Sequence, residues 1–263
     1  MMTRKETEDM IIRETKDSFI MIRQDDHARL SGYIAKNFSK EILASSHFFE
    51  DVITAACQHD RGWIGLDETP VLNDRSKVPY SFSDYPLLPK LAFYRIGLDE
   101  IEEMNQYAGL LCSMHFCSFF SQSKDENCIE FLHYETKRQM KIKKKLSDIE
   151  EPLLQQHFRL LQFSDDLSLY LCLNEPGADK KNEHPWFQRG FKNTEIFHPQ
   201  NKQLNARWKN ASEVIVAPFL FTKEFHVVLP FKSVSKKAIV GLGVAEAYEK
   251  SAMRQQKFSF LKA

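Results

Sequence analysis

The sequence lacks any apolar run long enough to cross a membrane, and residues 1–13 are polar and charged where a signal peptide would carry an apolar core. A transmembrane helix needs about 20 consecutive apolar residues, so we expect no membrane partner. An excess of positive charge is also lacking, because 36 Lys and Arg balance 36 Asp and Glu. Without that excess, no general attraction to nucleic acid is expected. These absences favour a cytoplasmic protein and leave open a homodimer.

Cysteine is scarce and has no metal-binding or disulfide pattern. The chain contains five cysteines, an odd number, and no pair has CxxC spacing. A secreted disulfide scaffold or a zinc ribbon would require such pairs. We therefore expect free, mostly buried thiols in a reducing compartment.

What is present is an ordinary globular composition, with 43% hydrophobic and 27% charged residues in 263. Residues 18–175 favour a helical body, since His27, Leu30 and Ile34 recur at helical spacing. A short apolar run at 19–22 predicts either an edge strand or the entry to a helix. Further helices are expected at 46–58, 91–105, 107–120, 127–146 and 152–172.

Residues 176–263 differ in character from this body. Two apolar runs at 213–221 and 225–231, separated by a short polar segment, predict a β-hairpin. The expected fold is therefore mainly α, in which a helical bundle at 18–175 carries a small β-containing C-terminal region at 176–263.

An adjacent pair, His59-Asp60, is expected at the end of a helix, just before Gly62. Two further histidines, His27 and His115, stand inside expected helices. Neutral imidazole and carboxylate oxygens are ligands for ions such as Zn, Fe and Mn. For His115 taken alone, a hydrogen-bonded core histidine is the commoner interpretation.

Asp165 and Asp166 interrupt a strongly apolar helical segment. An unpaired buried carboxylate costs several kcal/mol, so one of them is expected to face a cation, a hydrogen-bond network or solvent. We favour Asp165 as the ligand, because Leu167 and Tyr170 then remain on the packing face and Asp166 lies on the helix surface.

The order His27, His59-Asp60 and Asp165 resembles the HD superfamily of metal-dependent proteins. This resemblance implies a helical domain with one or two divalent metals, and many members hydrolyse phosphate esters of nucleotides. A minority are di-iron oxygenases with additional histidines between the His-Asp pair and the last Asp. His115 matches one such position, and His133 or His157 are the candidates for another.

The chain as a whole is similar to the DUF3891 family of uncharacterised bacterial proteins. The similarity rests on QDDHARLSG at 24–32, HDRGW at 59–63, SMH at 113–115 and DDLSLYLC at 165–172. In the second motif, Arg-Gly-Trp stands where many HD phosphohydrolases carry Gly-Lys, and Trp63 would form a wall for an aromatic or apolar substrate.

These resemblances lead to a principal hypothesis and two alternatives. In the first, a metal-dependent hydrolase acts on a phosphate ester or related small molecule. In the second, the same scaffold is a di-iron oxygenase. In the third, it is a non-catalytic ligand-binding or regulatory module, with the irregular segment 65–89 holding the ligand.

The hydrolase hypothesis assigns a role to each candidate residue. A divalent metal (Fe, Mn, Zn or Mg) would activate a water molecule. His115 would act as general acid or second ligand, and Arg61, Arg23 or Lys residues near the mouth of the site would bind an anionic substrate. The metal ligands are expected to be His27, His59, Asp60 and Asp165.

Overall fold

The computed structural model describes residues 10–43, 45, 47–146 and 149–263. Helices account for 50% of the chain and strands for 20%. Within the described residues, none of the helices combines the length and the hydropathy that a transmembrane span requires. The sequence-based prediction of a chain without membrane spans is consistent with this finding.

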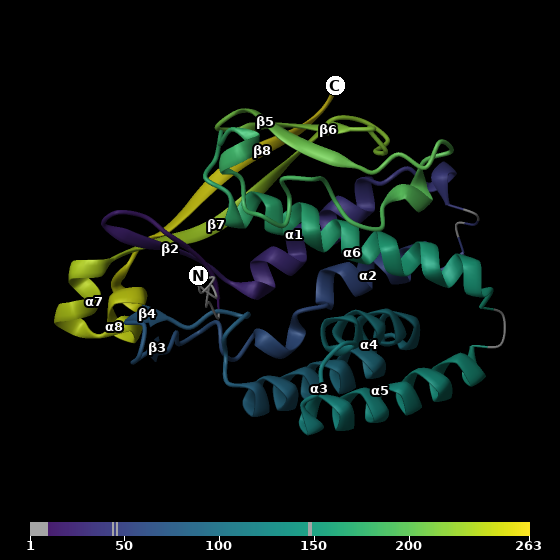
Figure 1. The fold of residues 1–263 in the computed structure, drawn as a ribbon, viewed down its shortest axis with the longest axis horizontal. Coiled ribbons are helices and arrows are strands. Elements are labelled where there is room, and N and C mark those ends of the chain that lie inside the picture. Colours follow the sequence, from purple (N-terminus) through teal and green to yellow (C-terminus); the bar gives the residue numbers. More distant parts are fainter. Residues whose placement is uncertain (1–9, 44, 46, 147–148) are drawn as a thin grey trace.

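A six-stranded sheet forms one side of the molecule, with strand order β1-β2-β7-β8-β6-β5 (Figure 1). All neighbouring strands are antiparallel except β6 and β8, which run parallel. The strands are β1 (Ile11–Glu14), β2 (Ser18–Ile22), β5 (Asn205–Asn210), β6 (Glu213–Ala217), β7 (Phe225–Ser235) and β8 (Met253–Lys262). A separate pair consists of β3 (Leu72–Asn73) and β4 (Val78–Pro79).

This sheet shows that the expectation of a mainly α protein with a small β region is wrong. Strand β1 begins inside the polar segment 1–13 and β2 follows it, and β2 pairs with β7 in a register that aligns Ser18 with Ser235. Pairing between strands so far apart in the sequence cannot be detected from the periodicity of neighbouring residues. One sheet therefore contains strands from both sides of residue 175. The division into a body at 18–175 and a C-terminal region at 176–263 stays a prediction.

The predicted β-hairpin is also wrong, although both of its strands exist. β6 ends at Ala217, before Pro218, whose missing N–H cannot join a ladder. β8 then lies between β6 and β7, so that Val214 pairs with Phe260 and Phe225 pairs with the same residue from the other side. Two short helices, α7 (Lys236–Leu242) and α8 (Val244–Lys250), stand between β7 and β8.

The helices of the body agree closely with the hydrophobic periodicity. Pro152 stands in the first turn of the last one, as its fixed φ angle favours. The run at 19–22 is a strand and lies inside the sheet rather than at its edge. The six helices are α1 (Gln24–Asn37), α2 (Phe49–Gln58), α3 (Leu87–Met104), α4 (Gln106–Phe120), α5 (Glu126–Lys145) and α6 (Glu151–Leu173).

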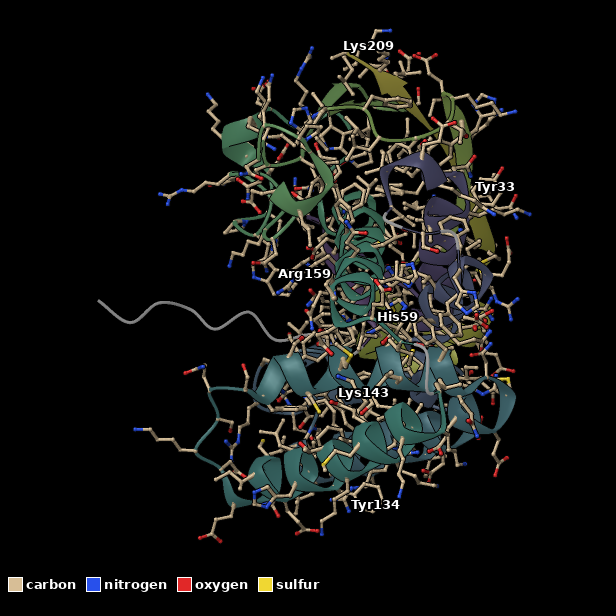
Figure 2. The ribbon with its side chains drawn as sticks, turned by 90° about the vertical axis from the view of Figure 1, so that its right-hand side faces the viewer. Tyr33, His59, Tyr134, Lys143, Arg159 and Lys209 are labelled. Carbon is tan, nitrogen blue, oxygen red and sulfur yellow. The ribbon has the colours of Figure 1, made fainter. Side chains whose placement is uncertain are left out.

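The body is arranged in layers below the sheet (Figure 1). α1, α2 and α6 pack on one another in the middle, and α1 also contacts β7. α3, α4 and α5 form the outer layer, joined to the middle through contacts of α4 with α2 and α6. His59 lies near the centre of the molecule, whereas Tyr134 and Lys209 lie at opposite ends (Figure 2). The segment after α2 is therefore held between the two helical layers.

Candidate metal centre

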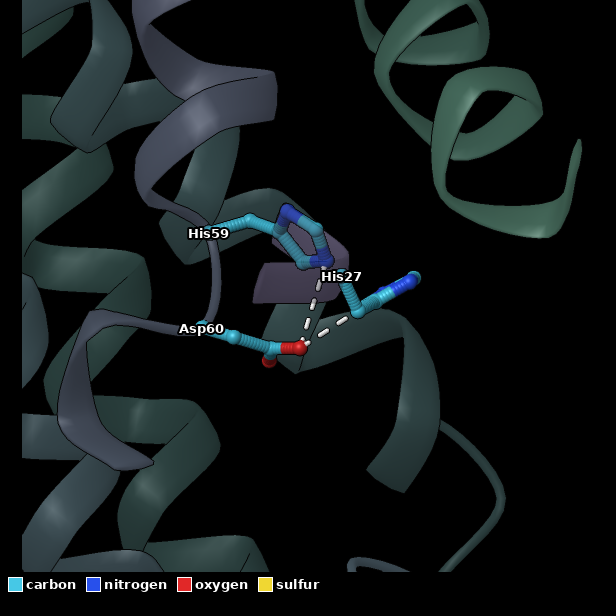
Figure 3. A group of neighbouring side chains, drawn as sticks. All are labelled: His27, His59 and Asp60. Atoms are coloured by element: carbon cyan, nitrogen blue, oxygen red, sulfur yellow. Dashed lines mark ion pairs between the residues drawn. The ribbon is translucent and has the colours of Figure 1, made fainter. Parts of the chain in front are cut away.

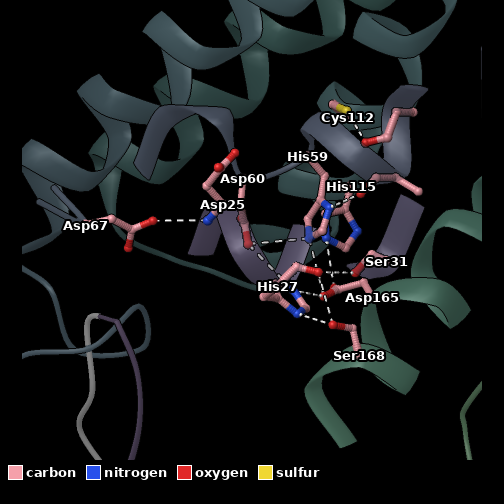
Figure 4. A network of polar contacts seen from close by, with 12 residues as sticks. Asp25, His27, Ser31, His59, Asp60, Asp67, Cys112, His115, Asp165 and Ser168 are labelled. Carbon is pink, nitrogen blue, oxygen red and sulfur yellow. Dashed lines mark hydrogen bonds and ion pairs between the residues drawn. The ribbon is translucent and has the colours of Figure 1, made fainter. Parts of the chain in front are cut away.

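Five polar side chains from four helical segments meet between the helical layers (Figure 4). Each is almost completely buried, with an exposed fraction of 9% or less. α1, α4 and α6 each supply one residue, and the end of α2 supplies two. The five are His27, His59, Asp60, His115 and Asp165.

Asp165 is the central residue of this cluster. Its Oδ1 lies 2.8 Å from His27 Nε2 and 3.4 Å from His59 Nε2. Its Oδ2 lies 3.2 Å from His115 Nε2. Asp60 approaches from the other side, with Oδ2 3.4 Å from His59 Nε2 and 3.7 Å from His27 Nε2 (Figure 3). His27 and His59 therefore each face both carboxylates, and His115 faces Asp165.

The position of the imidazole protons follows from the groups behind the rings. His59 Nδ1 lies 2.8 Å from the carbonyl oxygen of Ala56, which only accepts, so Nδ1 carries the hydrogen. The Ser168 hydroxyl donates to the carbonyl oxygen of His27 at 3.1 Å and lies 2.7 Å from His27 Nδ1. One hydroxyl has one proton, so Nδ1 donates to Ser168 in the assignment that satisfies both contacts. In the neutral rings, both Nε2 atoms then direct lone pairs at carboxylate oxygens.

A lone pair facing a carboxylate in a buried site is unfavourable unless a positive charge lies between them. His59 Nε2 is buried without a hydrogen-bond partner, and so is His115 Nδ1. Two sets of ligand atoms, each within 4.8 Å of one another, could hold an ion: His27 with His59 and Asp60, and His59 with His115 and Asp165. This donor set fits a divalent ion, and its three imidazoles suit Zn, Fe or Mn better than Mg, which prefers oxygen.

The pKa values of the clustered residues also indicate a site that stabilises positive charge. Burial lowers the pKa of His59, but the carboxylates of Asp60 and Asp165 outweigh it and raise that pKa to about 9. Burial works to raise the pKa of Asp165, yet the three histidines hold it well below its usual range. Burial raises the pKa of Asp60. Without a metal, the cluster therefore holds a proton at the point where a cation is stabilised.

The structure brings together all four residues expected to bind metal and adds His115. The other two histidines considered for a di-iron site lie elsewhere: His133 is exposed, and His157 Nδ1 is 2.7 Å from the Tyr107 hydroxyl. Arg61, expected to bind an anionic substrate, instead contacts Glu100, with Nε 2.5 Å from Oε2.

A cavity of about 370 Å³ opens beside the cluster. Trp63 forms part of its wall, as the sequence suggested, and the segment 65–89 contributes Phe82 and Ser83. Asp166 also lines it rather than lying on an outer surface, and burial, together with the charge of Asp165, raises the pKa of Asp166 to about 8. The other lining residues are Gln24, His27, His59, Asp60, Lys90, Tyr94, His115, Phe119, Phe120, Asp165, Leu169 and Trp186.

Sequence reasoning missed Lys90, Phe119 and Trp186 as parts of this cavity. Phe119 follows His115 by one helical turn, and that spacing was the one signal that could have indicated it. Lys90 and Trp186 lie in segments whose positions depend on tertiary contacts, so no local pattern marks them.

The fold and the cluster define a class of protein in which a six-stranded sheet and two helical layers surround a buried histidine–aspartate centre. The chain belongs to the family described as Protein of unknown function (DUF3891), whose model matches residues 10–236. The four motifs that suggested this family, between residues 24 and 172, all lie inside the matched range. Neither a curated protein nor a solved structure matches the chain.

Proposed function

We propose that this protein is a metal-dependent hydrolase of the HD type, acting on a phosphate ester or related small molecule. One observation carries the proposal: the Nε2 atoms of His27 and His59 both face the carboxylates of Asp60 and Asp165, while their Nδ1 atoms contact Ser168 and the Ala56 carbonyl oxygen. The order of these residues along the chain is the one found in HD proteins. The adjacent cavity supplies space for a substrate.

In this proposal, His27, His59, Asp60 and Asp165 hold the ion. Ser168 and the carbonyl group of Ala56 keep the two imidazoles turned toward it, as outer-shell partners of metal ligands commonly do. A bound divalent ion would activate water for attack and offset the charge of an anionic substrate.

His115 lies beside the ligands and lines the cavity. Its Nε2 is 3.2 Å from Asp165 Oδ2, and its Nδ1 makes no hydrogen bond with the described residues. We assign His115 the role of general acid to the leaving group.

Hydrolysis is favoured over di-iron oxygen chemistry by the histidine count at the centre. A di-iron site was expected to require one more inward histidine beside His115. His157 makes a hydrogen bond with the Tyr107 hydroxyl, and His133 is exposed. Among the described residues, the two ligand sets instead share His59.

Metal analysis of protein purified without chelators tests the centre directly. We expect about one equivalent of Mn, Fe or Zn in the wild type and in His226→Ala, which removes an exposed histidine on β7. The double variant His59→Ala, Asp60→Ala is expected to contain none. If the wild type neither contains metal nor takes it up from added Zn, Mn or Fe, the proposal is wrong.

The reaction class needs a second assay on the same samples. Release of inorganic phosphate from phenyl phosphate by the metal-loaded wild type, and its loss in the double variant, would support hydrolysis. Oxygen consumption without phosphate release would favour the oxygenase instead.

A further inference from the structure

We infer that the cavity beside the centre selects compact organic anions with a flat aromatic body of one or two rings and a single anionic group. The inference specifies the substrate class of the proposed hydrolase and rests on that function for the role of the ion. It is carried by three features of the cavity: its aromatic walls, its charges and its size.

The walls of the cavity are predominantly aromatic, and they come from segments far apart in the sequence. Trp63 and Tyr94 contact each other with ring centres 5.5 Å apart, and Phe82 contacts Trp186 at 6.3 Å. Phe119 lies 4.7 Å from the His115 ring, so one aromatic wall directly adjoins the centre. A flat apolar group placed between these rings would be buried next to the reacting groups.

The positive charge at the walls is small. Among the described residues that line the cavity, Lys90 is the sole Lys or Arg, and its Nζ donates to the Phe82 carbonyl oxygen at 3.3 Å. Arg23 pairs with Asp26 at 2.7 Å, and Arg61 pairs with Glu100, both outside the lining. A polyphosphate chain requires several cationic contacts, whereas one ammonium and a metal ion suffice for one anionic group.

The remaining charge disfavours additional anionic groups. Three acidic side chains, Asp60, Asp165 and Asp166, line the cavity against the one ammonium of Lys90, so a second anionic group meets no further cation among these lining residues. The volume of about 370 Å³ is near the lower end of ligand pockets, which span roughly 300–1,000 Å³. This space fits one or two rings with their anionic group better than a base, a sugar and three phosphates.

Calorimetric titration of the metal-loaded protein with phosphonates, which are not hydrolysed, tests the inference. Phenylphosphonate and methylphosphonate share an anionic group and differ in the ring. We expect phenylphosphonate to bind at least about tenfold more tightly than methylphosphonate, and more tightly than ATP.

Three variants and one control test whether the aromatic walls and Lys90 cause the difference in phosphonate binding. Phe119→Ala and Trp186→Ala alter side chains that are 53% and 49% exposed, so the fold should tolerate them. Both are expected to weaken phenylphosphonate binding by about tenfold and to leave methylphosphonate binding unchanged. Lys90→Met should weaken both. Tyr134→Ala, an aromatic residue that is 49% exposed on α5 outside the cavity, should change neither.

Metal content is measured in every sample, which separates the two proposals. Full metal content with equal binding of the two phosphonates, or with tighter binding of ATP, overturns the inference and leaves the metal centre intact. Selective phenylphosphonate binding by protein without metal supports the cavity and overturns the metal centre. The absence of any saturable phenylphosphonate binding overturns the inference whatever the metal content.

Discussion

The backbones of Gly62 and Gly97 touch, so that a Cβ atom placed on Gly97 would lie 2.5 Å from the Gly62 nitrogen. A Cβ on Gly62 would likewise lie 2.4 Å from the carbonyl oxygen of Phe93. This contact fixes the chain just after His59-Asp60 against α3. α2 already ends at Gln58, so Gly62 acts through this close contact, which positions the pair of ligands, rather than as the helix stop that the sequence suggested.

Replacing Gly97 by Ala should lower the free energy of unfolding by about 1–3 kcal/mol, because the added methyl group meets backbone that cannot move aside. The higher helix propensity of Ala, worth about 1 kcal/mol, offsets part of this loss. Urea denaturation measures the change. Gly65→Ala is the control, since nothing lies within 4 Å of its added Cβ. Equal stability of the two variants would contradict the close contact.

Removing the hydroxyl of Ser168 should weaken metal binding without abolishing it. Ser168→Ala leaves His27 Nδ1 without its acceptor, and loss of such a partner typically costs about 10–100-fold in metal affinity. Competition with a chelator of known affinity measures the loss. Ser164→Ala, one turn earlier on α6, is the matched control, because its buried Oγ makes no hydrogen bond. A similar affinity in both variants would show that Ser168 does not orient the ligand.

A bound ion should stabilise the fold, because it binds the assembled cluster and not the unfolded chain. At a free metal concentration of about 100 times Kd, the gain is about 2.7 kcal/mol. We expect Tm of chelator-treated protein to rise on addition of Zn or Mn. His59→Ala should show no rise, whereas His226→Ala should respond like the wild type. A rise of equal size in His59→Ala would place the bound metal elsewhere.

His157 should make the protein sensitive to acid. Burial lowers its pKa to about 4, below the ordinary value of 6.5. The folded state thus favours the neutral ring, and its contribution to stability is present above pH 6.5 and lost as the pH falls through about 4.

The variant His157→Gln should therefore lose less stability than the wild type between pH 6.5 and pH 4. The difference is on the order of 2–3 kcal/mol, at about 1.4 kcal/mol per pKa unit. Urea denaturation at a series of pH values measures it, with His226→Gln as the exposed control. Parallel pH profiles for all three proteins would exclude His157 as the group responsible.

The helices and the ligands could be predicted from the sequence because both depend on local patterns. α4 to α6 follow long apolar periodicities, which tertiary contacts reinforce. His59-Asp60 and Asp165 stand out because polar residues are rare in such apolar surroundings. That these residues meet was expected from a resemblance, and the structure confirms their proximity; metal binding stays a prediction.

The sheet could not be predicted for the opposite reason. β1 has four residues and β2 has five, too few for a clear alternation of apolar and polar positions. β7, the strand that pairs with β2, lies more than 200 residues away along the chain. β8 was missed because its first half, at 253–257, is mostly exposed and polar. Arg61 was misplaced in the cavity because its ion pair with Glu100 depends on how α3 packs.

The position of β8 between β6 and β7 has a consequence for the order in which the chain can fold during synthesis. β8 follows the other five strands of this sheet along the chain, yet it is the one that joins β5 and β6 to the rest of the sheet. Until residues 253–262 emerge, β6 and β7 each present an unpaired edge, and such edges pair readily with other chains. These two edges are therefore open to pairing with other chains after the helical body has been made and before β8 is available.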